Sequence, residues 1–369
     1  MDFDFSDEQK HLQREARRFL NDNCGTARVR GVLDDPDKSF DTELWSEMAQ
    51  LGWQGASVPE LYGGSGLGAT ELCAIAEELG RAITPTPFAS SIYAFAEGLL
   101  LIGTEQQKTE ILAQITSGEQ IGCIASVEGS GQRGINCSAE RGRINGVKIP
   151  VTDGDIADWA IVLAKDSDGA SLYLVNLKCA EVSASTLSTL DPTRGCAELK
   201  FKDALGQLLG VPGQGEETLR KIHDRAAIFV AFEQLGGAEA ALELAQSYAK
   251  DRYAFGRAIG SFQAIKHKLA RMYVANQIAR SNCYFGAWAL ESQNDLLPRA
   301  AASARIAATR AFQLITADTI EIFGGIGTTW EADCHLYYRR AKQLSLFLGP
   351  ANLWKERLAV ELEMLWADA

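Results

Sequence analysis

The sequence predicts a mostly α-helical protein with a β-domain in its middle. Apolar residues recur at three- and four-residue steps before about residue 120 and again after about residue 212, as in amphipathic helices. The stretch between carries short β-rich runs separated by turn-forming residues. A length of 369 residues suits two or three domains. We therefore expect an N-terminal helical domain (1–120), a middle β-barrel or sandwich (121–212) and a C-terminal four-helix bundle (213–369).

The first helix should begin after Ser6, because the acidic residues that follow it suit the first turn of a helix. Apolar residues at helical spacing continue to Leu20. Further amphipathic helices are expected over residues 69–81 and 104–116.

In the middle domain, strands are expected over residues 159–164, 172–175 and 197–201. Asn145-Gly146 predicts a β-hairpin turn, because both residues tolerate a positive φ. Strands at such regular spacing favour a small barrel or sandwich.

After Pro212-Gly213-Gln214-Gly215, four long helices are expected over residues 216–253, 262–292, 299–323 and 333–366. Gly236-Gly237 lies inside the first of them. Each glycine costs about 1 kcal/mol there relative to alanine, so the pair predicts close packing against another helix.

Composition excludes several classes of protein. Asp and Glu number 48 against 36 Lys and Arg, a net charge of −12, which is opposite to the balance of nucleic-acid-binding proteins. The opening MDFDFSDEQK does not resemble a secretory signal, and the most apolar stretch, residues 94–103, is far shorter than the roughly 20 residues of a membrane span. Eight cysteines form no C-x-x-C pair and four histidines no metal-binding spacing. We expect a cytoplasmic protein with reduced thiols and no metal.

The segment from Tyr248 to Gln263 carries the clearest chemistry. Arg252, at the end of a predicted helix, offers a planar fork of donors suited to a pyrophosphate, and Phe255 offers an aromatic face. Gln263 lies in the first turn of the next helix, where free N–H groups favour anions. From residue types alone, a plain interhelical turn with a solvated Arg252 stays open.

A glycine cluster follows Glu321 at the end of another predicted helix: Gly324, Gly325 and Gly327. Glycines let a backbone approach a ligand, but they also end helices, so the cluster alone decides nothing. Together, on this helix–β–helix plan, the two segments resemble the acyl-CoA dehydrogenase family over nearly the whole chain. The VPELYGGSGLG loop and the opening DFDFSDEQK match that pattern too.

This resemblance implies the family's fold, FAD bound at a subunit interface, and α,β-dehydrogenation of an acyl-CoA thioester. In that reaction a glutamate removes the α-proton, the β-hydrogen passes as hydride to the flavin, and an electron-transfer flavoprotein or a similar acceptor takes the electrons. The residues that match the family's contacts to the adenosine and pyrophosphate of a neighbour's FAD are Arg252, Phe255, Gln263, Gly324, Gly325 and Gly327, with Glu321 where relatives often have Gln.

The half-site for the flavin ring and thioester departs from the family pattern. Cys123 replaces a Tyr, Glu128 a Pro and Gln132 a Ser. Pro150 replaces the Trp that packs on the flavin, which removes apolar contact area. Two weaker cofactor candidates remain, Ser126 at a Thr position and the retained Thr152.

The family's catalytic base is absent from both positions where relatives carry it, because Leu348 and Ala226 stand there. Glu233 lies about two turns beyond Ala226, roughly 10 Å along the same helix. It is an outside candidate that we expect to be a paired structural carboxylate, so the catalytic residue of this chain stays unassigned.

One half-site is therefore kept and the other lost, which predicts an α2β2 complex with a homologous catalytic subunit. The pattern from Trp330 to Arg340 resembles bacterial α2β2 acyl-CoA dehydrogenases that act on steroid side chains, and it is also consistent with a core Trp330 and with Glu331 and Arg340 as salt-bridge partners. Two alternatives stay open. One is a homo-oligomer with a relocated base, Glu233 or Glu128, and the other is a flavin-free scaffold protein.

Overall fold

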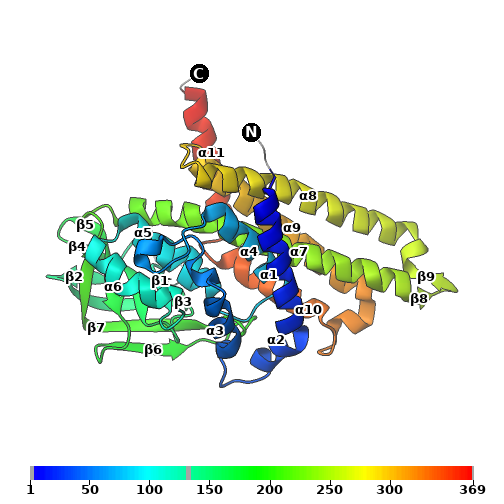
Figure 1. Cartoon of the computed structure of the whole chain (residues 1–369), viewed down its shortest axis with the longest axis horizontal. Coiled ribbons are helices and arrows are strands. Elements are labelled where there is room, and N and C mark those ends of the chain that lie inside the picture. Colours follow the sequence, from blue (N-terminus) through cyan, green and yellow to red (C-terminus); the bar gives the residue numbers. More distant parts are fainter. Residues whose placement is uncertain (1–3, 130–133, 368–369) are drawn as a thin grey trace. The chain divides into compact units, whose positions relative to one another are not determined.

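A computed structural model describes residues 4–129 and 134–367, with side chains described as far as Met364. The chain forms two compact units, neither of which is a continuous stretch of sequence (Figure 1). One comprises Met1–Val29, Ala69–Thr84 and Ala227–Ala369, and the other comprises Arg30–Gly68 and Pro85–Ala226. The predicted fold class, mostly α with a central β-region, is confirmed.

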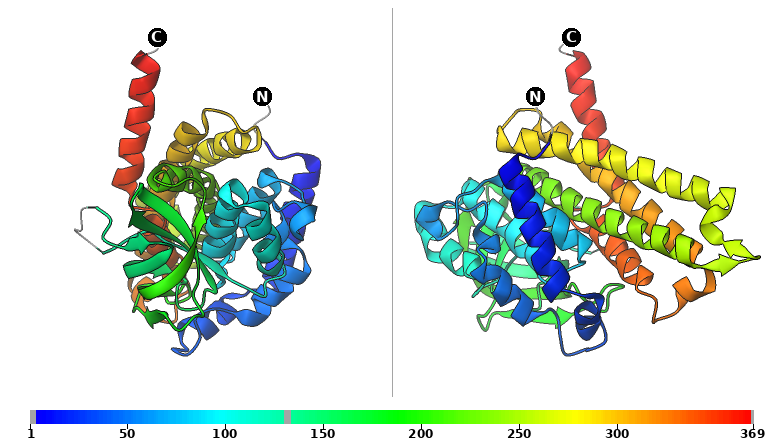
Figure 2. Two further views of the ribbon diagram at one scale, coloured as in Figure 1. Left: turned by 90° about the vertical axis from the view of Figure 1, so that its left-hand side faces the viewer. Right: turned by 45° about the vertical axis from the view of Figure 1, so that its right-hand side comes forward.

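The second unit contains the sheet, whose strands are β1 (Gly122–Ala125), β2 (Ser138–Glu140), β3 (Arg143–Thr152), β4 (Trp159–Asp166), β5 (Gly169–Asn176), β6 (Val182–Thr186) and β7 (Cys196–Leu209). Strands β4, β2, β3, β7 and β5 pair in that order, and β5 pairs back with β4. This closes a barrel, which Figure 2 (left) shows as strands curling around one another. β1 is attached at β4, and β6 at β7.

The same unit carries the helices α3 (Thr42–Gln50), η1 (Trp53–Gly55), η2 (Glu60–Tyr62), η3 (Ala89–Ala96), α5 (Glu97–Ile102) and α6 (Glu105–Thr116). The helix expected over residues 104–116 is α6, and Thr104 caps it in a capping box with Gln107. In the part of the chain that the structure describes, no helix is both long and apolar enough to span a membrane.

The prediction of a hairpin turn at Asn145-Gly146 is wrong. β3 runs through both residues and pairs with β7, with a register irregularity after Ile144. The turn lies at Arg141-Gly142, between β2 and β3, where both residues have positive φ (51° and 76°). Glycine is needed at 146 because a Cβ there would lie 2.8 Å from the Cα of Cys137. Close packing, not a chain reversal, explains this glycine.

The first unit is helical. It holds α1 (Asp7–Asn23), α4 (Ala69–Arg81), most of α7 (Gly215–Asp251), α8 (Gln263–Glu291), α9 (Leu297–Phe323), α10 (Cys334–Leu346) and α11 (Ala351–Ala367). The hairpin of β8 (Tyr253–Ala254) and β9 (Arg257–Ala258) joins α7 to α8, with the short helix η4 (Ile259–Ser261) before α8. Helix α2 (Thr26–Leu33) begins in this unit and ends in the other. Figure 2 (right) shows α7 and α8 side by side, leading to the hairpin.

Helices α4 and α7 cross with their backbones in contact, as Gly236-Gly237 predicts. A Cβ on Gly236 would lie 1.7 Å from the carbonyl oxygen of Glu77, and one on Gly80 would lie 1.8 Å from that of Glu233. A Cβ on Gly237 would lie 2.6 Å from the Phe312 ring of α9. Any larger residue would push these helices apart.

The last predicted helix, over residues 333–366, is broken in two. α10 ends at Leu346 and α11 begins at Ala351, so the described residues after 213 form five α-helices where four were expected. Leu348 takes a left-handed conformation (φ +62°) and Gly349 follows with φ +98°. A left-handed residue cannot continue an α-helix, and Pro350 lacks the N–H that a helix interior needs.

Candidate cofactor site

The two segments that carry chemistry in the sequence meet in one cavity of the helical unit. Its volume is about 470 Å³, and its lining residues are Tyr248, Arg252, Ile259, Ile322, Phe323, Gly324, Gly325 and Ile326. The end of α7 and the end of α9 form its walls. Arg252 thus lies with Gly324 and Gly325, from which it is separated by about 70 residues of chain.

Contacts between two aromatic side chains hold these helix ends together. The rings of Tyr248 and Phe323 stack with centroids 4.0 Å apart and planes inclined by 12°. The Tyr248 hydroxyl also donates a hydrogen bond of 3.4 Å to the carbonyl oxygen of Phe323. Tyr248 lies one turn before Arg252, whose N–H donates to the Tyr248 carbonyl oxygen at 2.9 Å. The backbone of Arg252 is therefore joined to the residue whose ring stacks on Phe323.

The glycines of the cluster have different structural reasons. Gly324 has a φ of +66°, which disfavours other residues, and a Cβ on Gly324 or Gly325 would meet nothing within 4 Å. A Cβ on Gly327 would lie 2.6 Å from the carbonyl oxygen of Ile320, so its own packing requires glycine. Gly325 has no such requirement within the chain. The space above it is open to a ligand that approaches the backbone.

Phe255 lies at the tip of the β8–β9 hairpin and is 95% exposed, with a positive φ of 54°. Its ring meets Phe262 edge-on at 6.3 Å, and the guanidinium of Arg257 stacks 4.0 Å over that same ring. Gln263 is the exposed first residue of α8, and its N-cap residue, Phe262, makes no side-chain cap. The first N–H groups of α8 therefore remain free for an anion or an amide partner.

Glu321 forms an ion pair beside the cavity. Its carboxylate lies 2.5 Å from the Nζ of Lys268 on α8, and Asp318 lies 3.4 Å from the same Nζ. Burial alone would lower the pKa of Lys268, but its hydrogen bond to Glu321 and the charge of Asp318 raise it above the usual value. Lys268 is therefore a stable cation.

The residues at the flavin-ring positions lie in the barrel unit. Cys123 is fully buried in β1, and burial raises the pKa of its thiol. Pro150 is exposed, and Ser126 and Thr152 are half-buried. Gln132 lies outside the described residues. No aromatic residue stands at the Cys123 or Pro150 position to pack on a flavin ring.

Glu128, at the position of the family's Pro, is bound to a buried cation. Its Oε1 lies 2.6 Å from the Nζ of Lys148, whose side chain is fully buried. It also accepts hydrogen bonds from the backbone N–H groups of Asn136 (2.7 Å) and Cys137 (3.0 Å). Although burial would raise the pKa of Glu128, these partners hold it below the usual value. Glu128 is thus an ionised anchor for its loop.

The two positions at which the resemblance to the family leads us to expect a base hold no titratable group. Leu348 and Ala226 are both buried. Buried Arg305 holds the turn at Leu348, because its guanidinium donates to the carbonyl oxygens of Leu344 and, at 2.7 Å, Phe347. Burial lowers the pKa of Arg305 to about 9. Glu233 is fully buried with its Oε1 3.6 Å from the Nη1 of Arg340.

The expectation of a core Trp330 is wrong, because its side chain is 47% exposed. Arg339 stacks 5.0 Å over its ring, and the Nε2 of His335 is hydrogen-bonded to its carbonyl oxygen at 2.8 Å. Arg340 does not pair with the exposed Glu331. It is buried, and it donates to the carbonyl oxygens of Thr84 and Ile83 as well as facing Glu233. The pattern from Trp330 to Arg340 therefore contributes a stack of Trp330 and Arg339 at the surface and a buried cation, Arg340.

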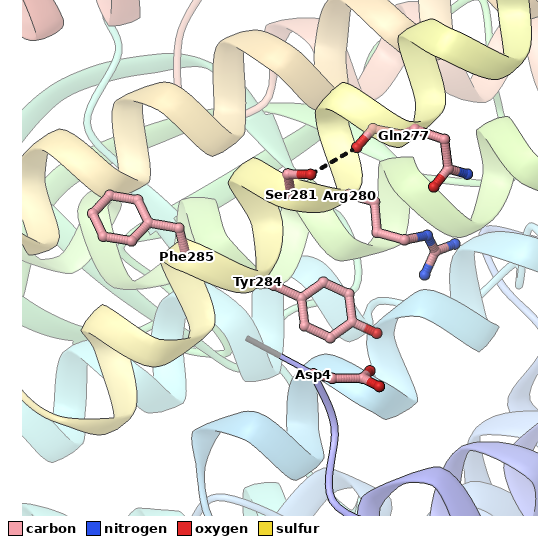
Figure 3. A pocket seen from close by; sticks show the side chains of 6 residues that line it. All are labelled: Asp4, Gln277, Arg280, Ser281, Tyr284 and Phe285. Carbon is pink, nitrogen blue, oxygen red and sulfur yellow. Dashed lines mark hydrogen bonds between the residues drawn. The ribbon is translucent and has the colours of Figure 1, made fainter. Parts of the chain in front are cut away.

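A second cavity, of about 500 Å³, lies along α8 (Figure 3). Its lining residues are Asp4, Gln277, Arg280, Ser281, Tyr284 and Phe285. Its one cation, Arg280, is already paired with Glu77 (2.9 Å) and Glu239 (2.8 Å). None of the predicted cofactor residues lines it. Within the described residues no group of His, Cys, Asp and Glu side chains could hold a metal ion.

Sequence reasoning missed Tyr248, Ile259 and Lys268 as parts or supports of the first cavity. Tyr248 had a usable signal, since it lies one helical turn before Arg252. Lys268 had none, because its partner Glu321 is 53 residues away in sequence. Only the approach of α8 to α9 makes them a pair.

Comparisons with known proteins find acyl-CoA dehydrogenases over both helical regions and over nearly the whole chain. The family "Acyl-CoA dehydrogenase, N-terminal domain" matches residues 6–119, and "Acyl-CoA dehydrogenase, C-terminal domain" matches residues 213–362. Acyl-CoA dehydrogenase IpdE2 of Mycobacterium tuberculosis is 33% identical over 91% of each chain. Among solved structures, a variant of the Tcur3481-Tcur3483 steroid ACAD is 29% identical with a TM-score of 0.88, covering 98% of this chain and 99% of that one. The ChsE4-ChsE5 complex from Mycobacterium tuberculosis is 25% identical with a TM-score of 0.89 and the same coverage.

Proposed function

The chain belongs to the acyl-CoA dehydrogenase family, and on that premise we propose that it is one subunit of a heteromeric, FAD-dependent acyl-CoA dehydrogenase. It contributes the cavity for the adenosine and pyrophosphate of FAD to a homologous partner subunit that carries the catalytic base. The complex acts in the cytoplasm. It introduces an α,β double bond into the acyl-CoA thioester of a steroid side chain.

One observation carries this proposal. The cavity unites Arg252 with the open backbone of Gly324 and Gly325, while the two positions of the family's base hold Leu348 and Ala226. A chain that keeps the cofactor's anionic half-site without a base can serve catalysis only beside a chain that has one.

The residues present fit the adenosine diphosphate half of FAD. Arg252 offers two parallel N–H donors to phosphate oxygens, and Gly325 leaves room for a diphosphate against the backbone. Phe255 presents a rigid, exposed aromatic face, and Gln263 presents an amide beside the uncapped start of α8. When bound, FAD supplies the acceptor for the hydride that leaves the β-carbon. These residues hold the cofactor and take no proton.

The remaining acidic candidates support a base from another chain. Glu128 and Glu233 each face a buried cation, Lys148 or Arg340, and neither is free to receive a proton from a thioester. A homo-oligomer with a relocated base is therefore the weaker alternative.

The steroid side chain and the electron acceptor are proposed by analogy. The steroid ACAD and the ChsE4-ChsE5 complex match over 98% of this chain, and the descriptions of both name two components. We accordingly propose an α2β2 assembly that passes electrons to an electron-transfer flavoprotein or a similar acceptor.

The experiment is to express this chain alone and with its base-bearing homologue, and to record the visible flavin spectrum and acyl-CoA turnover of both preparations. We expect little FAD and no turnover from the chain alone, and both from the complex. Stoichiometric flavin with turnover in the single chain would show a homo-oligomeric enzyme. A complex without flavin would show a scaffold protein.

A further inference from the structure

An acidic side chain borders the cavity in which we place a diphosphate. Glu321 directly precedes Ile322, a lining residue, and stands three and four residues before Gly324 and Gly325. The backbone N–H of Gly324 donates to the carbonyl oxygen of Glu321, so the two residues adjoin at the end of α9. α9 also ends here, and the partial negative charge of its carbonyl end disfavours an anion. An unpaired Glu321 would therefore oppose phosphate binding.

Lys268 faces this carboxylate from α8. Its Nζ lies 2.5 Å from Glu321, and its side chain is 19% exposed against 68% for Glu321. The cation is thus held by its surroundings, whereas the carboxylate reaches it from solvent. Asp318, the second neighbour of Lys268, has its own partner in Arg271 at 2.6 Å. Among the described residues, Lys268 is the cation that Glu321 contacts.

We propose that Lys268 is a positioning residue for the cofactor, which acts by neutralising Glu321 so that the cavity accepts the diphosphate. The inference rests on the proposed function and assigns Lys268 a role in the affinity of the complex for FAD. The charge of Arg252 then acts on the phosphates without an opposing carboxylate beside it. The ion pair also ties α8, which begins with Gln263, to the end of α9. The experiment must therefore separate the effect of the charge on Glu321 from the effect of this tie between the helices.

The test uses the complex with the base-bearing subunit, stripped of flavin and titrated with FAD. Lys268→Met leaves Glu321 unpaired, and we expect the dissociation constant of FAD to rise about three- to thirtyfold, the effect of one unit charge several ångströms away at intermediate dielectric. The double variant Lys268→Met with Glu321→Gln removes the charge and the tie together, and we expect affinity near that of the unchanged complex. Arg271→Met is the matched control, because it removes a cation one turn along α8 and leaves Glu321 paired.

Ionic strength provides an independent readout. The loss caused by Lys268→Met should shrink as salt rises from about 0.05 M to about 0.5 M, because screening weakens the repulsion. A tie that only held the helices would not respond in this way.

Each possible result of these titrations either supports or overturns the inference. Weak binding by Lys268→Met that the double variant restores supports the inference. Unchanged binding by Lys268→Met overturns it. Equal weakness of the single and double variants also overturns it, since the tie and not the charge would then matter. If the unchanged complex holds no FAD, the proposed function itself fails, whatever the variants do.

Discussion

Two glutamates that the sequence offers as replacement bases are each bound to a buried cation. Glu128 faces Lys148 at 2.6 Å and Glu233 faces Arg340 at 3.6 Å. The partners of Glu128 lower its pKa, and a carboxylate whose charged form is stabilised in this way is a poor acceptor for a substrate proton. At the scale of the residue, Glu128 is therefore a charged structural group and a poor candidate for a relocated base.

Arg252→Ala should weaken FAD binding by the assembled complex. A charge-assisted contact to a phosphate is worth roughly 1.5–3 kcal/mol, which is about ten- to hundredfold in affinity. The dissociation constant of FAD, from flavin fluorescence, measures it. Arg252→Lys is the control, and it should retain part of the affinity because it keeps the charge but loses the fork. An unchanged constant in Arg252→Ala would place the pyrophosphate elsewhere.

Leu348→Glu should give the isolated chain no dehydrogenase activity. Its carboxylate would stand at a family base position, yet Cys123 and Pro150 leave no aromatic wall for a flavin ring. A base without a seated hydride acceptor completes no reaction. Turnover of acyl-CoA with an artificial electron acceptor is the measurement. Activity of this variant alone would mean that the chain binds a flavin ring by itself.

At the scale of the element, the sequence correctly predicted those features that depend on interactions between neighbouring residues. The Ser6 cap and the helix over Ala69–Arg81 agree with the structure, since both depend on nearby residues. Asn145-Gly146 did not form a turn, because pairing of β3 with β7 extends through it. The break at Leu348 was missed because the apolar pattern continues on both sides of it. Strand pairing overrode the local turn preference of Asn145-Gly146, whereas at Leu348 the local turn signal of Gly349-Pro350 was the better guide than the apolar pattern.

Gly236→Ala should destabilise the protein. Its Cβ would lie 1.7 Å from the Glu77 carbonyl oxygen, and such overpacking costs about 1–3 kcal/mol or more. Gly31→Ala in α2 is a matched control, because nothing lies within 4 Å of its Cβ. That change should stabilise by about 0.4–1 kcal/mol, through lower entropy of the unfolded chain. Urea unfolding of both variants measures the difference, and equal effects would contradict the close crossing of α4 and α7.

The Glu128–Lys148 pair should make stability depend on pH. The pKa of Glu128 is lower in the folded state than in the unfolded state, so its contribution is present above the unfolded value and is lost as pH falls through the folded value. The unchanged protein should therefore lose stability below about pH 5, and Glu128→Gln should lose less over that range.

At pH 7, Glu128→Gln should be less stable by about 3–5 kcal/mol, because it leaves Lys148 buried without its counter-charge. Glu217→Gln, which breaks the exposed pair with Lys221, is the control and should change stability far less, because water and salt screen that pair. Denaturant unfolding at three values of pH, from neutral to acid, provides both tests. Similar costs for the two variants would show that Lys148 is not held by Glu128.

At the scale of the whole molecule, the residues expected to form the two halves of the cofactor site belong to different units. Arg252 and the open glycines line a cavity of the helical unit, whereas Cys123 and Pro150, which the resemblance to the family aligns with aromatic positions, belong to the barrel unit. That only one half of the cofactor site works in this chain stays a prediction from the motifs, since each half rests on its own short segment. The cavity was not predictable, because Tyr248 and Phe323 meet only in the folded chain.

An α2β2 assembly should therefore contain two FAD molecules. On the proposed function, each flavin takes one ring-side half and one adenosine-side half from adjacent subunits, and this chain would supply only the second. Flavin absorbance against protein mass, with the tetramer confirmed by light scattering, gives the ratio. Four equivalents per tetramer would mean that the barrel unit of this chain also seats a flavin.

The discontinuous helical unit has a consequence for the order in which the protein is made. α1 and α4 leave the ribosome long before residues from Ala227 onward, with which they form one unit. At about 5–20 residues per second, some 200 residues separate Val29 from the bulk of its unit by roughly 10 to 40 s. During that interval α1 and α4 can pack on each other, as Arg17 and Glu78 do in the folded unit, but α4 lacks α7, on whose backbone its Gly80 packs. Nascent chains of this protein should therefore depend on chaperone binding near their N-terminus more than a chain whose units are contiguous.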